Sequence, residues 1–140
     1  MTALRLSIHV IAASVWVGGQ LVLAGLVPTI RELGTDAPAR VARAFGRIAW
    51  PALGLTVLTG LWNVMAIPMT DLPHPWVELH VLAVLLSAAG AFAHTQATRV
   101  GARTTNDAIR TAMLAGGGAV AALGSVAAMY LGVMITTTAG

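Results

Sequence analysis

Three histidines, His9, His80 and His94, lie inside long apolar stretches of this 140-residue chain. An ionisable side chain is expensive to place in a membrane-spanning segment, so its presence there suggests a functional role. A neutral imidazole can ligate a metal ion or a haem iron, or it can hydrogen-bond to a neighbouring helix. These imidazoles are therefore the first candidates for a binding site.

Composition places the chain in a membrane. Hydrophobic residues make up 57% of it and charged residues 9%, which is outside the range of soluble domains. Four apolar stretches reach the roughly 20 residues that a spanning helix needs. We predict an all-α integral membrane protein, a four-helix up-down bundle that forms a single transmembrane domain over residues 1–140. The predicted helices cover about residues 4–27, 48–67, 76–97 and 111–135.

Prolines, glycines and short polar residues mark the predicted joints. Pro28 is expected to close the first helix. Thr35, Asp36 and Pro38 resemble a start signal for an amphipathic run that leads into the second helix. Gly101 and Asn106 mark the loop before the fourth helix, and no internal repeat is evident.

The basic residues predict the orientation in the membrane. The chain has eight arginines and no lysine, and seven of them flank the first and last loops, whereas Arg5 lies on the other face. Loops rich in arginine stay in the cytoplasm, so both termini should be extracytoplasmic, in a prokaryotic cytoplasmic membrane. Anchoring to anionic lipid headgroups explains this charge, and no nucleic-acid partner is expected. The seven arginines are Arg31, Arg40, Arg43, Arg47, Arg99, Arg103 and Arg110.

Depth along the helices groups possible metal ligands in the outer leaflet. At about 1.5 Å per residue, His9 and His80 each lie about one turn inside the outer end of a helix, at the same level. Met65 and Met129 come from the other two helices to that level. Imidazole and thioether ligands suit copper(I) or a haem iron. His94 lies about 21 Å from His80 by helical rise, so it would serve a separate inner site.

The same geometry allows a haem b site. In this alternative His9 and His80 are the axial ligands, and Trp16 and Asn63 lie beside them. For copper, a polar path would lead from the outer loop through the helices toward His94. The path residues are His74, Gln20, Thr56 and Ser87.

A structural role is the third alternative. His9 and His80 would then only hydrogen-bond to Asn63, Thr59 or a backbone carbonyl of another helix. The methionines would be packing residues. The absence of cysteine excludes disulfides and thiolate metal sites. No catalytic residues are assigned, because no phosphate loop, carboxylate pair or serine–histidine–acid grouping occurs in one layer.

Several short motifs occur in the first three predicted helices. A histidine is followed by a tryptophan and paired glycines, and a Thr-Gly-Leu run comes late in the second helix. This pattern resembles the membrane domain of the copper resistance protein D (CopD) family, and more distantly HemJ, the membrane protoporphyrinogen oxidase. The matching residues include His9, Trp16, Gly18, Gly19, Phe45, Pro51, Thr59, Gly60, Leu61, Asn63, Trp76 and Leu79.

The resemblance implies copper handling. Both families usually carry a lysine near the start of the third helix, and here His80 stands at or beside that position, while His94 occupies an asparagine position of CopD. We therefore favour a copper-binding or copper-transport protein with metal ligands His9, His80, Met129, Met65 and His94, and keep haem b binding as the alternative, for electron transfer or HemJ-like porphyrinogen oxidation.

Four classes of partner are expected. They are the lipid bilayer, a metal ion or haem, a periplasmic or extracellular metal donor, and a second copy of the chain. The last would form a homodimer through the glycine face at Gly116, Gly117 and Gly118.

Overall fold

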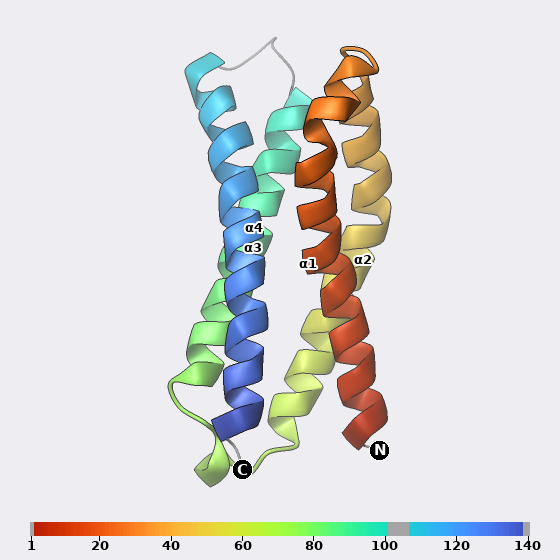
Figure 1. The fold of residues 1–140 in the computed structure, drawn as a ribbon. Coiled ribbons are helices and arrows are strands. Elements are labelled where there is room, and N and C mark those ends of the chain that lie inside the picture. The colour runs from red at the N-terminus through yellow and green to blue at the C-terminus, as the bar shows by residue number, and fades with distance from the viewer. Residues whose placement is uncertain (1, 101–106, 139–140) are drawn as a thin grey trace. The chain divides into compact units, whose positions relative to one another are not determined.

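Four long helices make up most of the chain in the computed structural model, which describes residues 2–100 and 107–138 (Figure 1). All four are long and apolar enough to cross a membrane, so the predicted all-α membrane class is confirmed. The predicted loop from Gly101 to Asn106, with Arg103, lies outside the described residues. The elements are α1 (Thr2–Glu32), α2 (Ala37–Met65), the short 3-10 helix η1 (Met69–Asp71), α3 (Trp76–Val100) and α4 (Asp107–Thr138).

The helices pack as two antiparallel pairs, α1 with α2 and α3 with α4. In the first pair, Arg5 near the start of α1 is hydrogen-bonded to Asn63 near the end of α2. In the second, His80 near the start of α3 is bonded to Ala128 late in α4. Each pair is a helical hairpin, and we call α1 with α2 hairpin 1 and α3 with α4 hairpin 2.

The first helix is longer than its sequence suggested. Pro28 lies inside α1, which continues to Glu32, so the prediction that this proline ends the helix is wrong. A proline removes a single backbone donor, and one missing bond close to a helix end is tolerated in a membrane helix. The turn into α2 comes instead at Gly34, whose φ of 117° is accessible to glycine without steric cost.

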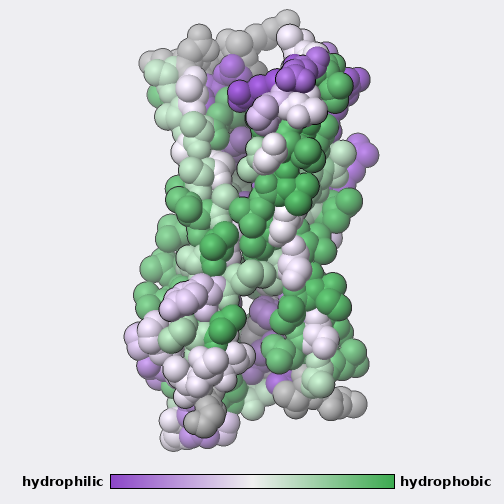
Figure 2. All heavy atoms as spheres, in the orientation of Figure 1, coloured by the Kyte–Doolittle hydropathy of each residue, from purple (hydrophilic) through white to green (hydrophobic). Residues whose placement is uncertain are grey.

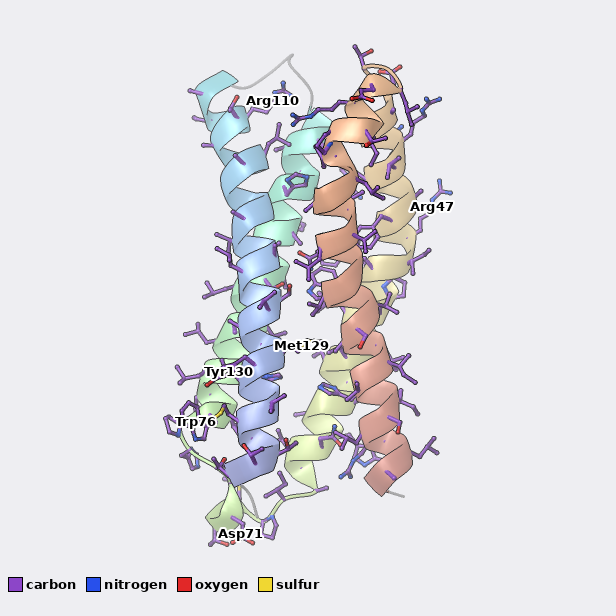
Figure 3. The ribbon with its side chains drawn as sticks, in the orientation of Figure 1. Arg47, Asp71, Trp76, Arg110, Met129 and Tyr130 are labelled. Carbon is purple, nitrogen blue, oxygen red and sulfur yellow. The ribbon has the colours of Figure 1, made fainter. Side chains whose placement is uncertain are left out.

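The second helix begins earlier than predicted. It starts at Ala37 rather than near residue 48, with Asp36 at the N-cap position and a proline in the first turn, as the start signal indicated. The amphipathic run is part of the same helix, and its arginines Arg40, Arg43 and Arg47 are all exposed. Figure 3 shows Arg47 extending away from the α2 ribbon. The ends of α3 and α4 differ from prediction by a few residues.

Apolar side chains cover the outer surface of the helices. Leu58 of α2 is 68% exposed and Leu123 of α4 is 71% exposed. In Figure 2 hydrophobic residues cover the middle stretches of the helices, and hydrophilic residues gather near helix ends, most clearly where α1 meets α2. Such surfaces are stable against lipid tails and not in water.

Hairpin 2 is held by direct contact between helix backbones. A Cβ atom added to Gly90 would lie 2.7 Å from the carbonyl oxygen of Gly117, so the two helices approach as closely as glycine permits. Ser87, 1% exposed, donates a hydrogen bond from Oγ to the carbonyl of Ala121 at 2.8 Å. Small residues and interhelical hydrogen bonds of this kind drive helix association in lipid.

This packing corrects the predicted dimer face. Gly117 faces the backbone of α3, and a Cβ on Gly118 would lie 3.3 Å from Nδ1 of His94, so both glycines are covered within hairpin 2. Only Gly116 of the three has open space around it. Consecutive helical residues point about 100° apart, so three adjacent glycines cannot share one face.

Candidate metal centre

The imidazole of His9 is held by α2. Its Nδ1 lies 2.9 Å from the carbonyl oxygen of Thr56 and 3.1 Å from Oγ1 of Thr59. A carbonyl can only accept, so Nδ1 carries the hydrogen and donates it. The neutral ring then has its lone pair on Nε2, which is the protonation state of a histidine that ligates a metal through Nε2.

The other two intramembrane histidines are held in the same way by α4. Nδ1 of His80 donates to the carbonyl of Ala128 at 2.8 Å, and Nδ1 of His94 donates to the carbonyl of Leu114 at 2.7 Å. Both rings therefore place their lone pair on Nε2 as well. All three histidines share one tautomer, although they lie on two different helices.

A glycine four residues after the accepting carbonyl completes each arrangement. In a helix the N–H of residue i+4 bonds to the carbonyl of residue i, so a side chain at i+4 would cover the remaining lone pair of that oxygen. Glycine leaves it open, and the ring lies against the glycine. We call this arrangement of histidine, carbonyl i and glycine i+4 the imidazole motif. Its members are His9 with Thr56 and Gly60, His80 with Ala128 and Gly132, and His94 with Leu114 and Gly118.

The motifs of His9 and His80 occur at matched positions of the two hairpins, which indicates an internal repeat. Moving 71 residues along the chain converts His9 into His80, and moving 72 residues converts Thr56 and Gly60 into Ala128 and Gly132. This repeat was not evident from the sequence alone. The sequence signal is the short match of Ile-His-Val-Ile-Ala around His9 to Leu-His-Val-Leu-Ala around His80.

Equivalent contacts elsewhere support the repeat. Gly19 of α1 lies against the ring of Phe45, and their equivalents in hairpin 2 are Gly90 and Gly117, which also face each other. The buried alanines agree too, since Ala49 and its equivalent Ala121 are 2% and 3% exposed. The repeat is weak in sequence because different side chains fill equivalent places, here a phenyl ring in hairpin 1 and a second glycine in hairpin 2.

His94 has no counterpart in hairpin 1. The equivalent position of α1 is Leu23, which has no ligating atom. Hairpin 1 thus carries one imidazole motif and hairpin 2 carries two. His9 and His80 form the matched pair, and His94 stays a candidate for a separate site.

The predicted thioether ligands are exposed. Met65 is the last residue of α2 and is 76% exposed. Met129 is 47% exposed and directly follows Ala128, the residue that holds His80. Figure 3 shows where its side chain leaves α4. Among the described residues, no group of three or more His, Cys, Asp or Glu side chains could hold a metal ion.

Two of the predicted path residues use their hydroxyls within the hairpins. Thr56 donates to the carbonyl of Ala52 at 2.9 Å, and Ser87 bonds across to α4. His74, just before α3, pairs with Glu78 in the first turn of α3, and both side chains are exposed. Gln20 differs, because its Nε2 is buried without a hydrogen-bond partner in the described part of the protein. The polar path stays a prediction.

Gln20 yields a test of that prediction. A buried donor without a partner costs roughly 1–3 kcal/mol. If Gln20 has no bound water or substrate to contact, Gln20→Leu should stabilise hairpin 1 by about 1 kcal/mol, measured by SDS-induced unfolding in detergent. Loss of stability or of ligand uptake in this variant would instead show that the amide has a partner.

The residue that sequence analysis missed as part of the site is Arg5. It was used only to orient the helices, yet its Nε donates to Oδ1 of Asn63 at 2.5 Å, and its guanidinium carbon lies 5.7 Å from the ring centre of Trp62. Arg5 and His9 are four residues apart on α1, as Thr59 and Asn63 are on α2. That shared spacing was the available signal, because it places each pair on one face of its own helix. Trp16, the other predicted haem neighbour, is buried and packs 5.6 Å from the Trp50 ring.

Glycine at the imidazole motif has a measurable role. A Cβ on Gly60 would lie 3.0 Å from Cε1 of His9, whereas a Cβ on Gly54 meets nothing within 4 Å. Alanine at either site gains up to about 1 kcal/mol of helix propensity. We expect Gly54→Ala to be more stable than the wild type. Gly60→Ala should be about 1 kcal/mol less stable than Gly54→Ala, because its added methyl group displaces the His9 ring. Equal stability of the two variants would contradict the motif.

Comparisons with family models, curated proteins and solved structures found no match for this chain. The resemblance to CopD therefore stays a prediction, and the candidate site is argued from its own residues.

Proposed function

We propose that this membrane protein binds haem b, with His9 of hairpin 1 and His80 of hairpin 2 each serving as an axial ligand. The observation that carries the proposal is the matched imidazole motif, in which equivalent histidines of a repeated hairpin are both held through Nδ1. A metal-ligating histidine almost always donates its other ring N–H to a carbonyl, a carboxylate or water, which fixes the tautomer and raises the basicity of the ligating nitrogen.

The charge near His9 favours haem over copper. Arg5 is one helical turn from His9 and is fixed there by Asn63 and Trp62. A positive side chain next to a copper(I) site would oppose binding of the cation, whereas haem b carries two propionate carboxylates. Haem also needs only two axial ligands, which agrees with the two matched imidazoles and does not require the exposed methionines.

Electron transfer is the function that this ligand set supports best. Bound haem would supply a one-electron redox centre. An iron with a histidine at each axial position would have none free for a substrate, which disfavours a role in binding oxygen or oxidising a porphyrinogen. In this proposal the protein orients the imidazoles through Thr56 and Ala128.

Copper(I) is the second candidate. The favouring observation is Met129, a thioether directly after the residue that holds His80. In this alternative the imidazoles of His9 and His80 and the sulfur of Met129 would bind the ion, supplied by an extracytoplasmic donor, in line with the resemblance to CopD. Soft thioether and imidazole ligands both suit copper(I).

The arginines support an orientation with both termini outside the cytoplasm. Arg31 at the end of α1 and Arg99 near the end of α3 are exposed, as are those at the start of α2. The proposed haem site would then lie in the outer leaflet. A reporter domain that is active only outside the cytoplasm should therefore be active when it is fused to either terminus.

An absorption spectrum with elemental analysis tests the two candidates. The purified protein, or protein titrated with ferric haem in detergent, should show a Soret band and a low-spin spectrum on reduction, with about one haem per chain. Copper retained in its place would contradict the haem proposal and support the second candidate. Binding of neither would leave the histidines with a structural role and contradict both.

A further inference from the structure

A set of hydrogen-bond donors lies beside His9 and is not used by the imidazole motif. Arg5 donates from Nε to Asn63 and faces the Trp62 ring. Arg5 has no acidic partner within residues 2–100 and 107–138. The ion pair found in this part of the chain joins His74 and Glu78. Arg5 lies in the first turn of α1, so its guanidinium is at the level of the membrane interface, where it can bind an anionic group of a ligand that extends out of the apolar region.

The chemistry of this cluster selects an anion. With Nε of Arg5 bonded to Asn63, the two Nη groups have no acceptor among the described residues. Oδ1 of Asn63 is occupied by Arg5, which leaves the Nδ2 group of Asn63 as a further donor. Several donors without an acceptor suit a carboxylate or phosphate oxygen, and arginine binds both with paired hydrogen bonds.

Hairpin 2 shows that the fold does not need this cluster. The residues equivalent to Arg5 and Asn63 are Trp76 and Ile135, neither of which can reproduce the charge or the hydrogen bond. The imidazole motif of His80 nevertheless forms with the same geometry as that of His9. Arg5 and Asn63 are therefore particular to hairpin 1 and are not required to hold an intramembrane imidazole.

We propose that Arg5 and Asn63 bind a propionate carboxylate of the haem that His9 ligates. This inference rests on the proposed function. Arg5 and His9 are separated by about 6 Å of helical rise, and the propionates project from one edge of the porphyrin. The cluster thus binds the polar edge of the ligand near the start of α1 while the imidazole binds its metal.

Esterified haem provides the test. Apo-protein in detergent is titrated with ferric haem b and with its dimethyl ester, which has no carboxylates, for the wild type and for Arg5→Gln. A charge-assisted hydrogen bond contributes enough for the wild type to prefer haem b over the ester by about 10- to 100-fold. Arg5→Gln should weaken haem b by that factor and leave the ester unchanged. Arg5→Lys should restore part of the preference.

Control variants separate a local effect from a general one. Arg40→Gln removes an exposed arginine at the start of α2 and should leave both affinities unchanged. Equal weakening of haem b and ester by Arg5→Gln would assign Arg5 a structural role and overturn the inference. Equal affinity of the wild type for the two ligands would overturn it as well, while leaving the proposed function intact. Binding of neither ligand by the wild type would overturn both.

A lipid headgroup is the other source of an anionic oxygen. The wild type and Arg5→Gln are therefore also compared in phosphatidylglycerol and phosphatidylcholine nanodiscs without haem. We expect the two lipids to stabilise both proteins equally. Stabilisation by phosphatidylglycerol that is lost in Arg5→Gln would show that the cluster binds lipid phosphate, and would overturn the assignment to a propionate.

Discussion

Replacing His80 with alanine should abolish the low-spin haem spectrum. Removing a residue that only orients a ligand typically costs 10- to 100-fold in metal affinity, so removing the ligand itself should weaken haem binding by more than about 100-fold. His9→Ala should have the same effect, because His9 is the equivalent residue of hairpin 1. The measurement is a haem titration of each variant, followed by the Soret band.

His94→Ala is the matched control for this prediction. His94 forms the same imidazole motif on the same two helices, with its Nδ1 bonded to Leu114. Its loss therefore removes an equal interhelical hydrogen bond, worth about 0.6 kcal/mol on average in membrane proteins. The Soret band of His94→Ala should be unchanged. If His80→Ala and His94→Ala reduce haem binding equally, His80 acts through the packing of hairpin 2 and not as a ligand.

The second large effect is expected from Gly117→Val. A Cβ at this position would lie 2.8 Å from the carbonyl oxygen of Gly90 and 2.9 Å from the backbone nitrogen of His94. These are backbone atoms of α3, which cannot move aside as a flexible side chain would. We expect separation of α3 from α4 and a loss of about 3 kcal/mol in SDS-induced unfolding, at the upper end of overpacking costs.

The adjacent glycine is the control for Gly117. Gly116→Val adds the same side chain to the same helix, at a position with nothing within 4 Å. Its effect on stability should be within about 0.5 kcal/mol, because it creates no clash. Comparable destabilisation by the two variants would mean that helix propensity, and not the backbone contact with Gly90, explains the result.

The repeat changes how the site is understood. His9 and His80 were grouped by depth in the membrane, an argument that depends on helix boundaries. Their equivalence within two hairpins depends instead on matched hydrogen bonds to Thr56 and Ala128. The differences between the repeats then identify residues particular to one hairpin, namely Arg5 and Asn63 in hairpin 1 and His94 in hairpin 2. A difference at equivalent positions is more informative here than any one residue alone.

The sequence by itself determined the membrane class, the four helices and the candidate imidazoles. These properties depend on composition and on local order along the chain, since an apolar stretch of sufficient length must satisfy its backbone groups within a helix. Asp36 likewise indicated the start of α2 from its local pattern. Pro28 wrongly suggested the end of α1. The helix continues to Glu32, because one missing backbone hydrogen bond close to a helix end is tolerated.

Only the tertiary structure decided which atoms of the imidazoles are engaged and which glycines face a neighbouring helix. His9 and Thr56 are 47 residues apart, and no local pattern predicts that Nδ1 of the first meets the carbonyl of the second. Gly116 and Gly117 are identical in sequence terms, yet one is open and the other touches α3. The physical reason is that a contact between helices depends on the rotation of each about its axis, which packing across the pair determines and composition does not.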